Sequence, residues 1–315
     1  MEHGEAIRQA IANRAGRDYP AAGDPRSREG TVFPLHRPKF AAAFSGGRTV
    51  FTIGSCFARN IEEALEGRDV VLPTRDFRVP AEEWPYRPNG LLNEFTPGTI
   101  AQRIRFALED RAFSDATLVA NGELWADLLV IGGADVSHAR ALERRAEMAA
   151  VYTRLASADL VIITLGYVEA WFDTLSGLFL TRMPPQRVAE REPGRFVLKR
   201  LDVEESMALL QPALFALADR GIRVILTVSP VPLSVTFTAM DCVTANEFSK
   251  AVLRVCADRL SRHPNIDYFP SYEIVRSCGM PAYGEDQLHV RDDLVRAITG
   301  YMIGLYEGTG SAAVD

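Results

Sequence analysis

Two nucleophile types stand side by side in Gly54-Ser55-Cys56-Phe57-Ala58, directly after an apolar segment. A serine on a tight turn that opens a helix exposes its hydroxyl group, and the first backbone N–H groups of the helix point at an incoming anion. This arrangement is typical of a nucleophile beside its oxyanion site. We therefore predict that Ser55 is the nucleophile and that it stands beside an oxyanion site formed by backbone N–H groups.

Two other interpretations of this turn remain open. Serine is a common helix N-cap, so the Ser55 hydroxyl group could cap the helix that follows. Cys56 could be a thiol nucleophile instead, but the reactivity of a thiol depends on its electrostatic surroundings, and we expect the Cys56 side chain to pack inward.

A second chemical pattern lies near the end of the chain, in Asp286-Gln287-Leu288-His289. A carboxylate three residues before a histidine can hold the imidazole in one tautomer, which suits the ring for use as a general base. We predict that His289 is the base and that Asp286 orients it.

The elements that position these residues follow from hydrophobic periodicity. Apolar runs predict five strands at 49–53, 70–72, 160–165, 224–228 and 266–269. Three of these runs are unbroken, which is typical of a parallel sheet covered by helices on both faces. Amphipathic segments predict helices at 57–65, 139–155, 203–218, 245–260 and 294–306.

The remaining segments divide the chain around this α/β domain. Residues 1–45 are expected to form an N-terminal helix and an extended, proline-containing arm, and 46–307 the domain itself. Residues 74–158 are too long for an ordinary connection and are expected to form a helical insertion between the second and third strands. The small, polar tail 308–315 is expected to fray.

Several separated motifs resemble one known family. Gly54-Ser55-Cys56-Phe57-Ala58 is the signature of the GSCFA family, whose members resemble the SGNH (GDSL-like) hydrolases. The other matching segments stand in the same order: Thr164-Leu165-Gly166, Glu169-Ala170-Trp171, 227–233, Asn246 with Ser249-Lys250, and 268–274.

The resemblance implies a single three-layer, flavodoxin-like domain with strand order 2-1-3-4-5. It also implies a serine-hydrolase mechanism, in which Ser55 attacks an acyl carbonyl, His289 transfers the proton and Asp286 orients His289. Gly54 and Gly166 match glycines of the oxyanion and substrate-binding region, where the N–H groups of Ser55 and of a nearby glycine hold the oxyanion.

One departure from the SGNH pattern concerns the oxyanion site. SGNH enzymes usually carry Gly-x-Asn-Asp after the third strand, where this chain has Gly166-Tyr167-Val168-Glu169, so the asparagine donor is missing. An ionised Glu169 cannot donate a hydrogen bond, and we therefore name Asn93, in the insertion, as the replacement donor. Glu169 could instead orient a substrate hydroxyl group or pair with a basic side chain.

Further polar residues follow the later strands. Ser229 stands at the carboxyl end of the fourth strand, where a pocket wall is expected, and could hydrogen-bond substrate. Asn246, Ser249 and Lys250 share one side of a helix because they are three and four residues apart. The plain interpretation of that side is a polar helix face.

Composition and charge exclude some classes of binding partner and of cofactor. The net charge is −6, with 35 basic and 41 acidic residues, and this argues against general binding to nucleic acid or to an anionic membrane. There is no basic, apolar leader and no run of about 18 apolar residues, so we expect a cytoplasmic protein. The four cysteines show no metal-ligand or disulfide spacing, and no cofactor or metal is predicted.

The sequence thus predicts a serine-dependent acyl-ester hydrolase or O-acyltransferase, which takes a small-molecule or glycan ester. The alternative is a carbohydrate- or ligand-binding protein on the same fold without turnover, since fold does not imply function.

Overall fold

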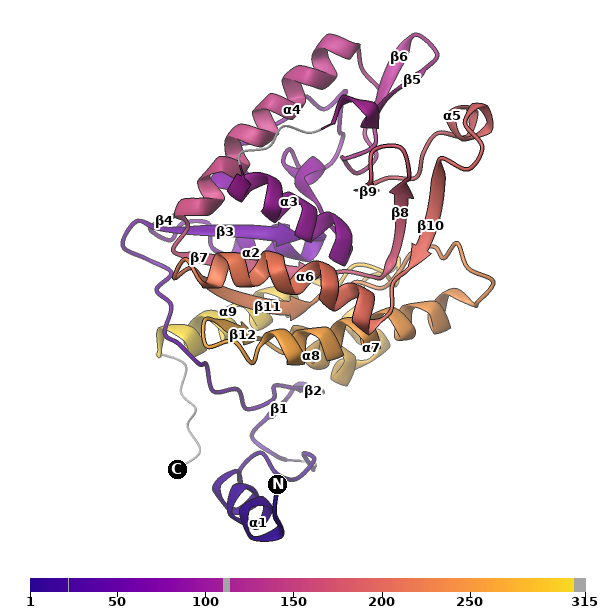
Figure 1. Ribbon diagram of the computed structural model, residues 1–315. Helices are drawn as coiled ribbons and strands as arrows, with labels where there is room; N and C mark the ends of the chain where they lie inside the picture. Colours follow the sequence, from indigo (N-terminus) through magenta and orange to yellow (C-terminus); the bar gives the residue numbers. More distant parts are fainter. Residues whose placement is uncertain (22, 110–113, 309–315) are drawn as a thin grey trace.

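A five-stranded parallel sheet forms the centre of the molecule in the computed structural model, which describes residues 1–315 except 22, 110–113 and 309–315 (Figure 1). The strands lie in the order β12-β11-β7-β3-β4. Their bounds are β3 (Arg48–Gly54), β4 (Val70–Val71), β7 (Leu160–Leu165), β11 (Arg223–Val228) and β12 (Ile266–Tyr268). The predicted α/β class and parallel sheet are confirmed.

Helices cover both faces of this sheet, as its apolar strands require. One face carries α2 (Cys56–Ala64), α8 (Ser271–Cys278) and α9 (Asp292–Glu307). The other carries α3 (Pro97–Glu109), α6 (Val203–Ala218) and α7 (Cys242–Leu260). All strands run parallel, so their carboxyl ends share one edge, where β3 leads directly into α2 (Figure 1).

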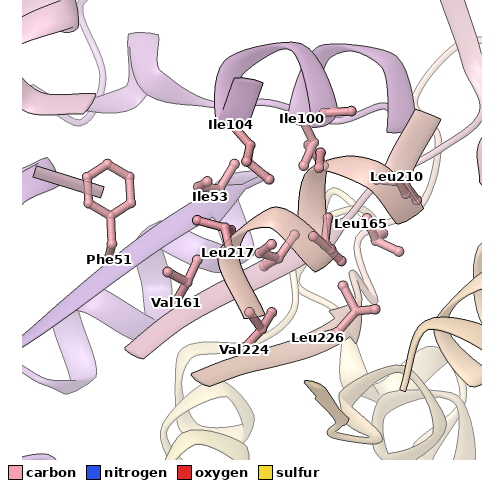
Figure 2. Packing of buried hydrophobic residues seen from close by; sticks show 14 of the residues in the cluster. Phe51, Ile53, Ile100, Ile104, Val161, Leu165, Leu210, Leu217, Val224 and Leu226 are labelled. Atoms are coloured by element: carbon pink, nitrogen blue, oxygen red, sulfur yellow. The ribbon is translucent and has the colours of Figure 1, made fainter. Parts of the chain in front are cut away.

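Alternate residues of the strands fill the two cores. Phe51 and Ile53 of β3 pack with Ile100 and Ile104 of α3 on one face (Figure 2). Val50, which precedes Phe51 and points to the opposite face, belongs to the core on the α2 and α9 side. Burial of each such side chain contributes about 1.5–3 kcal/mol, and the two cores together hold the edge that carries the site in place.

The segment between β4 and β7 contains more than the predicted helices. It includes α3, α4 (His138–Tyr152), the short 3-10 helices η1 (Pro73–Arg75), η2 (Gly90–Leu92), η3 (Asp115–Thr117) and η4 (Thr153–Ser157), and a hairpin of β5 (Leu118–Asn121) and β6 (Leu124–Asp127). The expected helical insertion is thus accompanied by a β-hairpin that the sequence analysis did not predict. The hairpin turns at Gly122, whose φ is +75°, and buries Val119 and Ala126 beneath a second sheet.

That second sheet was not predicted. It is antiparallel, in the order β10-β8-β9, and follows β7. Its strands are β8 (Glu169–Asp173), β9 (Leu178–Leu180) and β10 (Phe196–Arg200), with α5 (Gln186–Arg191) between the last two. It stands beyond the carboxyl ends of the central strands, beside the place where a site is expected (Figure 1).

The N-terminal region begins with α1 (His3–Ala12), which buries none of its residues, and continues through a small hairpin of β1 (Ser27–Arg28) and β2 (Thr31–Val32). The arm then packs onto the domain, because Phe33 and Phe44 join the α9-side core. His36 Nε2 lies 3.0 Å from Asp267 Oδ2 and fixes the arm to β12.

At the other end of the chain, a short 3-10 helix, η5 (Met280–Ala282), precedes α9. The predicted tail lies outside the described residues except for Gly308, the left-handed cap of α9. No helix in the described part of the chain is long and apolar enough to cross a membrane.

Candidate active site

Gly54 brings two central strands unusually close at the turn between β3 and α2. Its φ is +145°, and a Cβ atom there would lie 2.1 Å from Thr164 Oγ1 and 2.5 Å from the Thr164 carbonyl oxygen. Only glycine fits this approach of β3 to β7. The turn therefore sets the position of both residues that follow, Ser55 and Cys56.

Ser55 faces the interior at this turn. It is the N-cap of α2, its Oγ accepts a hydrogen bond from the Phe57 N–H, and only 3% of the residue is exposed. The same Oγ lies 2.9 Å from Ser229 Oγ and 3.4 Å from Thr164 Oγ1. Ser55, Thr164 and Ser229, called here the hydroxyl cluster, thus join the carboxyl ends of β3, β7 and β11.

Two groups that were predicted to contact a substrate, the Ser55 N–H and the Ser229 hydroxyl group, form hydrogen bonds within the hydroxyl cluster. The Ser55 N–H donates to Thr164 Oγ1 at 3.0 Å, so the expected oxyanion donor is already engaged. The hydroxyl group of Ser229, which is 1% exposed, faces Ser55 and not an open pocket wall. His289 is not among the hydrogen-bond partners of Ser55 Oγ within the described residues.

Cys56, the next residue, interacts with the predicted histidine. It is half-buried at the first position of α2, and the interaction of its side chain with His289 raises the pKa of that histidine. His289 Nδ1 lies 2.5 Å from Asp286 Oδ2, which leaves Nε2 as the ring nitrogen for a second partner. Cys56, His289 and Asp286, called here the thiol site, have the arrangement of nucleophile, base and orienting carboxylate.

The pKa values of His289 and Asp286 favour the charged forms of both side chains. The hydrogen bond with Cys56, followed by that with Asp286, raises the pKa of His289 to about 9. The hydrogen bond from His289, together with those from the backbone N–H groups of His289 and Leu288, lowers the pKa of Asp286 to about 2. At neutral pH the imidazole is therefore protonated and the carboxylate is ionised.

A loop of the insertion borders the turn. The Glu94 N–H donates to the Gly54 carbonyl group at 2.9 Å, which places Asn93 next to the start of α2. Asn93 is buried, and its Oδ1 has no hydrogen-bond partner in the described part of the chain. The Gly166 N–H, by contrast, donates to the Phe95 carbonyl group at 2.8 Å and is engaged.

Glu169 holds a neighbouring loop. Its Oε1 accepts from the Thr236 hydroxyl group at 2.7 Å, and its Oε2 accepts from the Phe237 N–H at 2.9 Å. Neither of these two hydrogen bonds involves a basic side chain, which was one of the alternatives for Glu169. Glu169 instead fixes the loop that follows β11, at one wall of a cavity.

That cavity has a volume of ≈ 140 Å³ and lies beyond the end of β7. Aromatic and polar side chains line it together, among them Phe95, Tyr167, Trp171, Glu169 and Arg182. The Phe95 and Tyr167 rings are stacked at 5.4 Å. Neither the hydroxyl cluster nor the thiol site lines the cavity, so it is a neighbouring compartment and not the reaction centre.

The side of α7 that carries Asn246, Ser249 and Lys250 is buried, which corrects its interpretation as a polar face. Asn246 Oδ1 accepts from the Leu233 N–H at 2.9 Å. Lys250 Nζ donates to the carbonyl groups of Gly166 and Val231 at 2.7 and 2.8 Å. This face therefore binds the loops that follow β7 and β11.

Sequence reasoning assigned no role to Thr164 and expected Cys56 to pack inward. A small polar residue at the end of an otherwise apolar strand was the available signal for Thr164. The four cysteines are free, and within the described residues no group of three or more His, Cys, Asp and Glu side chains could hold a metal ion.

Comparisons with known proteins agree on a family. The sequence profile of the GSCFA family matches residues 49–301. A search of curated proteins gives no significant match. The chain belongs to the GSCFA family.

A comparison with solved structures matches two forms of one enzyme at low similarity. The first is a mutant of Axe2, an acetyl-xylooligosaccharide esterase from Geobacillus, which is 14% identical over 86% of this chain and 97% of that chain, with a TM-score of 0.34. The second is a catalytic mutant of Axe2, an acetylxylan esterase from Geobacillus stearothermophilus, 14% identical over 85% of this chain and 95% of that chain, with a TM-score of 0.32.

Proposed function

We propose that this member of the GSCFA family is an acyl-ester hydrolase or O-acyltransferase whose nucleophile is Cys56, with His289 as acid and base and Asp286 as the orienting carboxylate. The observation that carries the proposal is the 2.5 Å contact of His289 Nδ1 with Asp286 Oδ2, on a histidine whose pKa Cys56 raises from the start of α2. Ser55, the nucleophile predicted from the sequence, remains the competing candidate.

The protonated state of His289 is consistent with a thiol nucleophile, although the shift that produces it comes first from Cys56 itself and then from Asp286. A serine needs a neutral imidazole to accept its proton, whereas a cysteine works as a thiolate beside an imidazolium. With a pKa of about 9, His289 is an imidazolium at neutral pH. The beginning of α2 adds the positive end of a helix dipole next to the Cys56 sulfur.

The reaction follows from these positions. The Cys56 thiolate attacks the acyl carbonyl carbon, and the resulting oxyanion is stabilised by the backbone N–H of Cys56 at the start of α2, since the N–H groups of Phe57 and Ala58 donate to Ser55. The intermediate collapses to a thioester as protonated His289 gives its proton to the departing alkoxide. The neutral imidazole then takes a proton from water or from a second alcohol, which attacks the thioester and releases the acid or the new ester.

Asn93 fits the role of a second oxyanion donor in this scheme. Its side chain is buried beside the turn, and because its Oδ1 has no partner among the described residues, the amide group is free to turn its –NH₂ toward the oxyanion. An amide –NH₂ directed at the oxyanion supplies the donor that Glu169 cannot supply.

The substrate is an O-acyl ester of a small molecule or carbohydrate. The compartment beyond β7 supports this class, because it combines aromatic rings with the side chains of Glu169 and Arg182. Aromatic faces contact apolar sugar faces and charged groups bind hydroxyl groups, which suits a polyhydroxylated alcohol.

Turnover of 4-nitrophenyl acetate tests the proposal. Cys56→Ala is expected to lower kcat/KM by at least about 10³-fold, because removal of a nucleophile leaves only binding and oxyanion stabilisation. Cys278→Ala, which removes another half-buried thiol, is the matched control and is expected to retain activity. Full activity of Cys56→Ala would reject the thiol nucleophile, and addition of alcohols to the wild type distinguishes transfer from hydrolysis.

A further inference from the structure

A small cavity lined by arginines lies between α2 and the first loops of the insertion. Its volume is ≈ 80 Å³, and about 10–15 Å³ of cavity volume holds one water molecule, so it suits a ligand the size of a few water molecules. Four arginines line it together with Glu62 and Glu63: Arg59, Arg75, Arg78 and Arg87. This space is called here the arginine cavity.

Arg59 is the buried member of this set, with 1% of the residue exposed. Its Nη1 lies 2.6 Å from Glu62 Oε1, and its Nη2 donates to the Thr52 carbonyl group at 3.1 Å. Its Nε has no hydrogen-bond partner among the described residues. A buried donor without a partner is costly, and an acceptor bound in the arginine cavity would satisfy it.

Glu62 does not fill the cavity with negative charge, because both of its oxygens are occupied. Oε1 accepts from the Thr74 hydroxyl group at 2.6 Å and lies against Arg59, and Oε2 accepts from the Asn89 side-chain amide at 2.8 Å. The carboxylate is therefore fixed within the wall and balances the charge of Arg59 alone.

The other three arginines leave positive charge in surplus. Arg78 is exposed and has no ion pair or hydrogen bond to any residue that the structure describes. Arg75 pairs with Glu66 at 3.1 Å, and Arg87 pairs with Glu63 at 2.9 Å. Because ion pairs at the surface are weak, both guanidinium groups remain able to bind a further anion.

We propose that the arginine cavity is a binding site for a phosphoryl group, held by the guanidinium groups of Arg59, Arg78 and Arg87. A guanidinium group presents its N–H donors as a planar fork that matches phosphate oxygens. A phosphoryl group carries a charge of about −1.5 to −2 at pH 7 and has several acceptor oxygens. It would supply the acceptor that Arg59 Nε lacks and the negative charge that Arg78 lacks.

The arginine cavity lies close to the turn that carries both candidate nucleophiles. Arg87 Nη1 donates to the Cys56 carbonyl group at 3.2 Å. Arg59 and Glu63 follow Cys56 by three and seven residues on α2, which is roughly 5–10 Å along the helix axis. A phosphoryl group in the cavity and an ester at the turn can therefore belong to one substrate, whichever of Ser55 and Cys56 is the nucleophile.

Isothermal titration calorimetry with inorganic phosphate at low ionic strength tests the proposal. Wild type is expected to bind one phosphate with saturation. Arg78→Gln should raise Kd about tenfold, the loss expected for one charge-assisted hydrogen bond. Arg187→Gln is the matched control, because it makes the same change at an exposed arginine of α5 that does not line the cavity, and it should leave Kd unchanged.

Two results would overturn the proposal. One is the lack of saturable phosphate binding by wild type. The other is an equal rise of Kd in Arg78→Gln and Arg187→Gln, which would show that phosphate responds only to the net charge of the protein. Neither result depends on ester turnover, so a failure here leaves the proposed function untouched.

A titration with glucose 6-phosphate distinguishes the two sources of the phosphoryl group. Binding tighter than that of inorganic phosphate would assign the cavity to the phosphoryl group of a larger substrate. Weaker binding would assign it to free phosphate. In either case the proposal requires that Arg78→Gln weakens the binding and that Arg187→Gln does not.

Discussion

The hydroxyl cluster and the thiol site begin at the adjacent residues Ser55 and Cys56, but they differ in burial and in the side chains that surround them. Ser55 points into the domain, where its Oγ meets other hydroxyl groups and is sealed from solvent. Cys56 is half-buried and raises the pKa of His289, which forms an ion pair with Asp286 at the surface. Successive helical residues are about 100° apart around the axis, so one step along the chain separates a cap from a nucleophile.

This difference teaches that a nucleophile is recognised by its base and not by its residue type. The oxygen of Ser55 has three protein neighbours, which is what a structural hydroxyl group requires. Cys56 instead interacts with His289, which Asp286 holds by its Nδ1. Four predictions can break or sharpen this contrast.

The largest effect is expected at the histidine of the thiol site. His289→Ala should lower kcat/KM for an ester by about 10²–10⁴-fold, because the proton donor for the leaving group is lost. Asp286→Asn should have a smaller effect of the same kind, since it disturbs the orientation of the ring. Steady-state kinetics with 4-nitrophenyl acetate measure both. If His289→Ala were fully active, neither Cys56 nor Ser55 could use it as a base.

The next effect is on stability and concerns the turn that both regions share. Gly54→Ala would place a Cβ atom against Thr164, and we expect it to lower the free energy of unfolding by roughly 2–5 kcal/mol through strain and overpacking. Urea unfolding measures this change. Gly46→Ala is the control for loss of a glycine with positive φ, because nothing lies within 4 Å of its added Cβ atom. Equal losses in the two variants would show that the approach of β3 to β7 is not the cause.

Ser55→Ala separates the two regions directly. It removes the N-cap of α2 and the hydrogen bond to Ser229, and should lower the free energy of unfolding by about 1–2 kcal/mol. Ser229→Ala should lower it by a similar amount, because both variants break the same contact. Alkylation of Cys56 should continue in both proteins. A Ser55→Ala protein that keeps its stability and loses all turnover would restore Ser55 as the nucleophile.

The smallest effect is the pH dependence of stability. The pKa of His289 is raised from 6.5 to about 9, so protonated His289 stabilises the fold fully below pH 6.5, and this contribution disappears as the pH rises through about 9. Because the pair is exposed, the difference in stability between wild type and His289→Gln should be small, and it should vanish above pH 9. A difference that grows with pH in urea titrations would mean that the sign of the interaction is reversed.

The central architecture was predictable because strands buried on both faces leave a strong sequence pattern. The runs at 160–165 and 224–228 coincide with β7 and β11, and the 203–218 segment is α6. The second sheet escaped prediction because its strands are short, half-buried and bounded by charged residues, as in 196–200. Their pairing depends on contacts with 118–127, which no local pattern encodes.

The candidate site was predictable only in part. The pairing of Asp286 with His289 follows from local spacing and is present in the structure. Which of Ser55 and Cys56 faces that pair depends on how α2 is rotated against the sheet, and this is set by the close packing of Gly54 on Thr164 across 110 residues of chain. Such a long-range contact cannot be inferred from one sequence.

Mapping of the acyl-enzyme tests the central claim most directly. Wild type, Cys56→Ala and Ser55→Ala are mixed with 4-nitrophenyl acetate, quenched in acid and analysed by peptide mass spectrometry. The account predicts an acetyl group on Cys56 in wild type and Ser55→Ala, removable by neutral hydroxylamine as a thioester is, and no acetyl group at the turn in Cys56→Ala. An acetyl group on Ser55 in wild type, retained in Cys56→Ala, would contradict it.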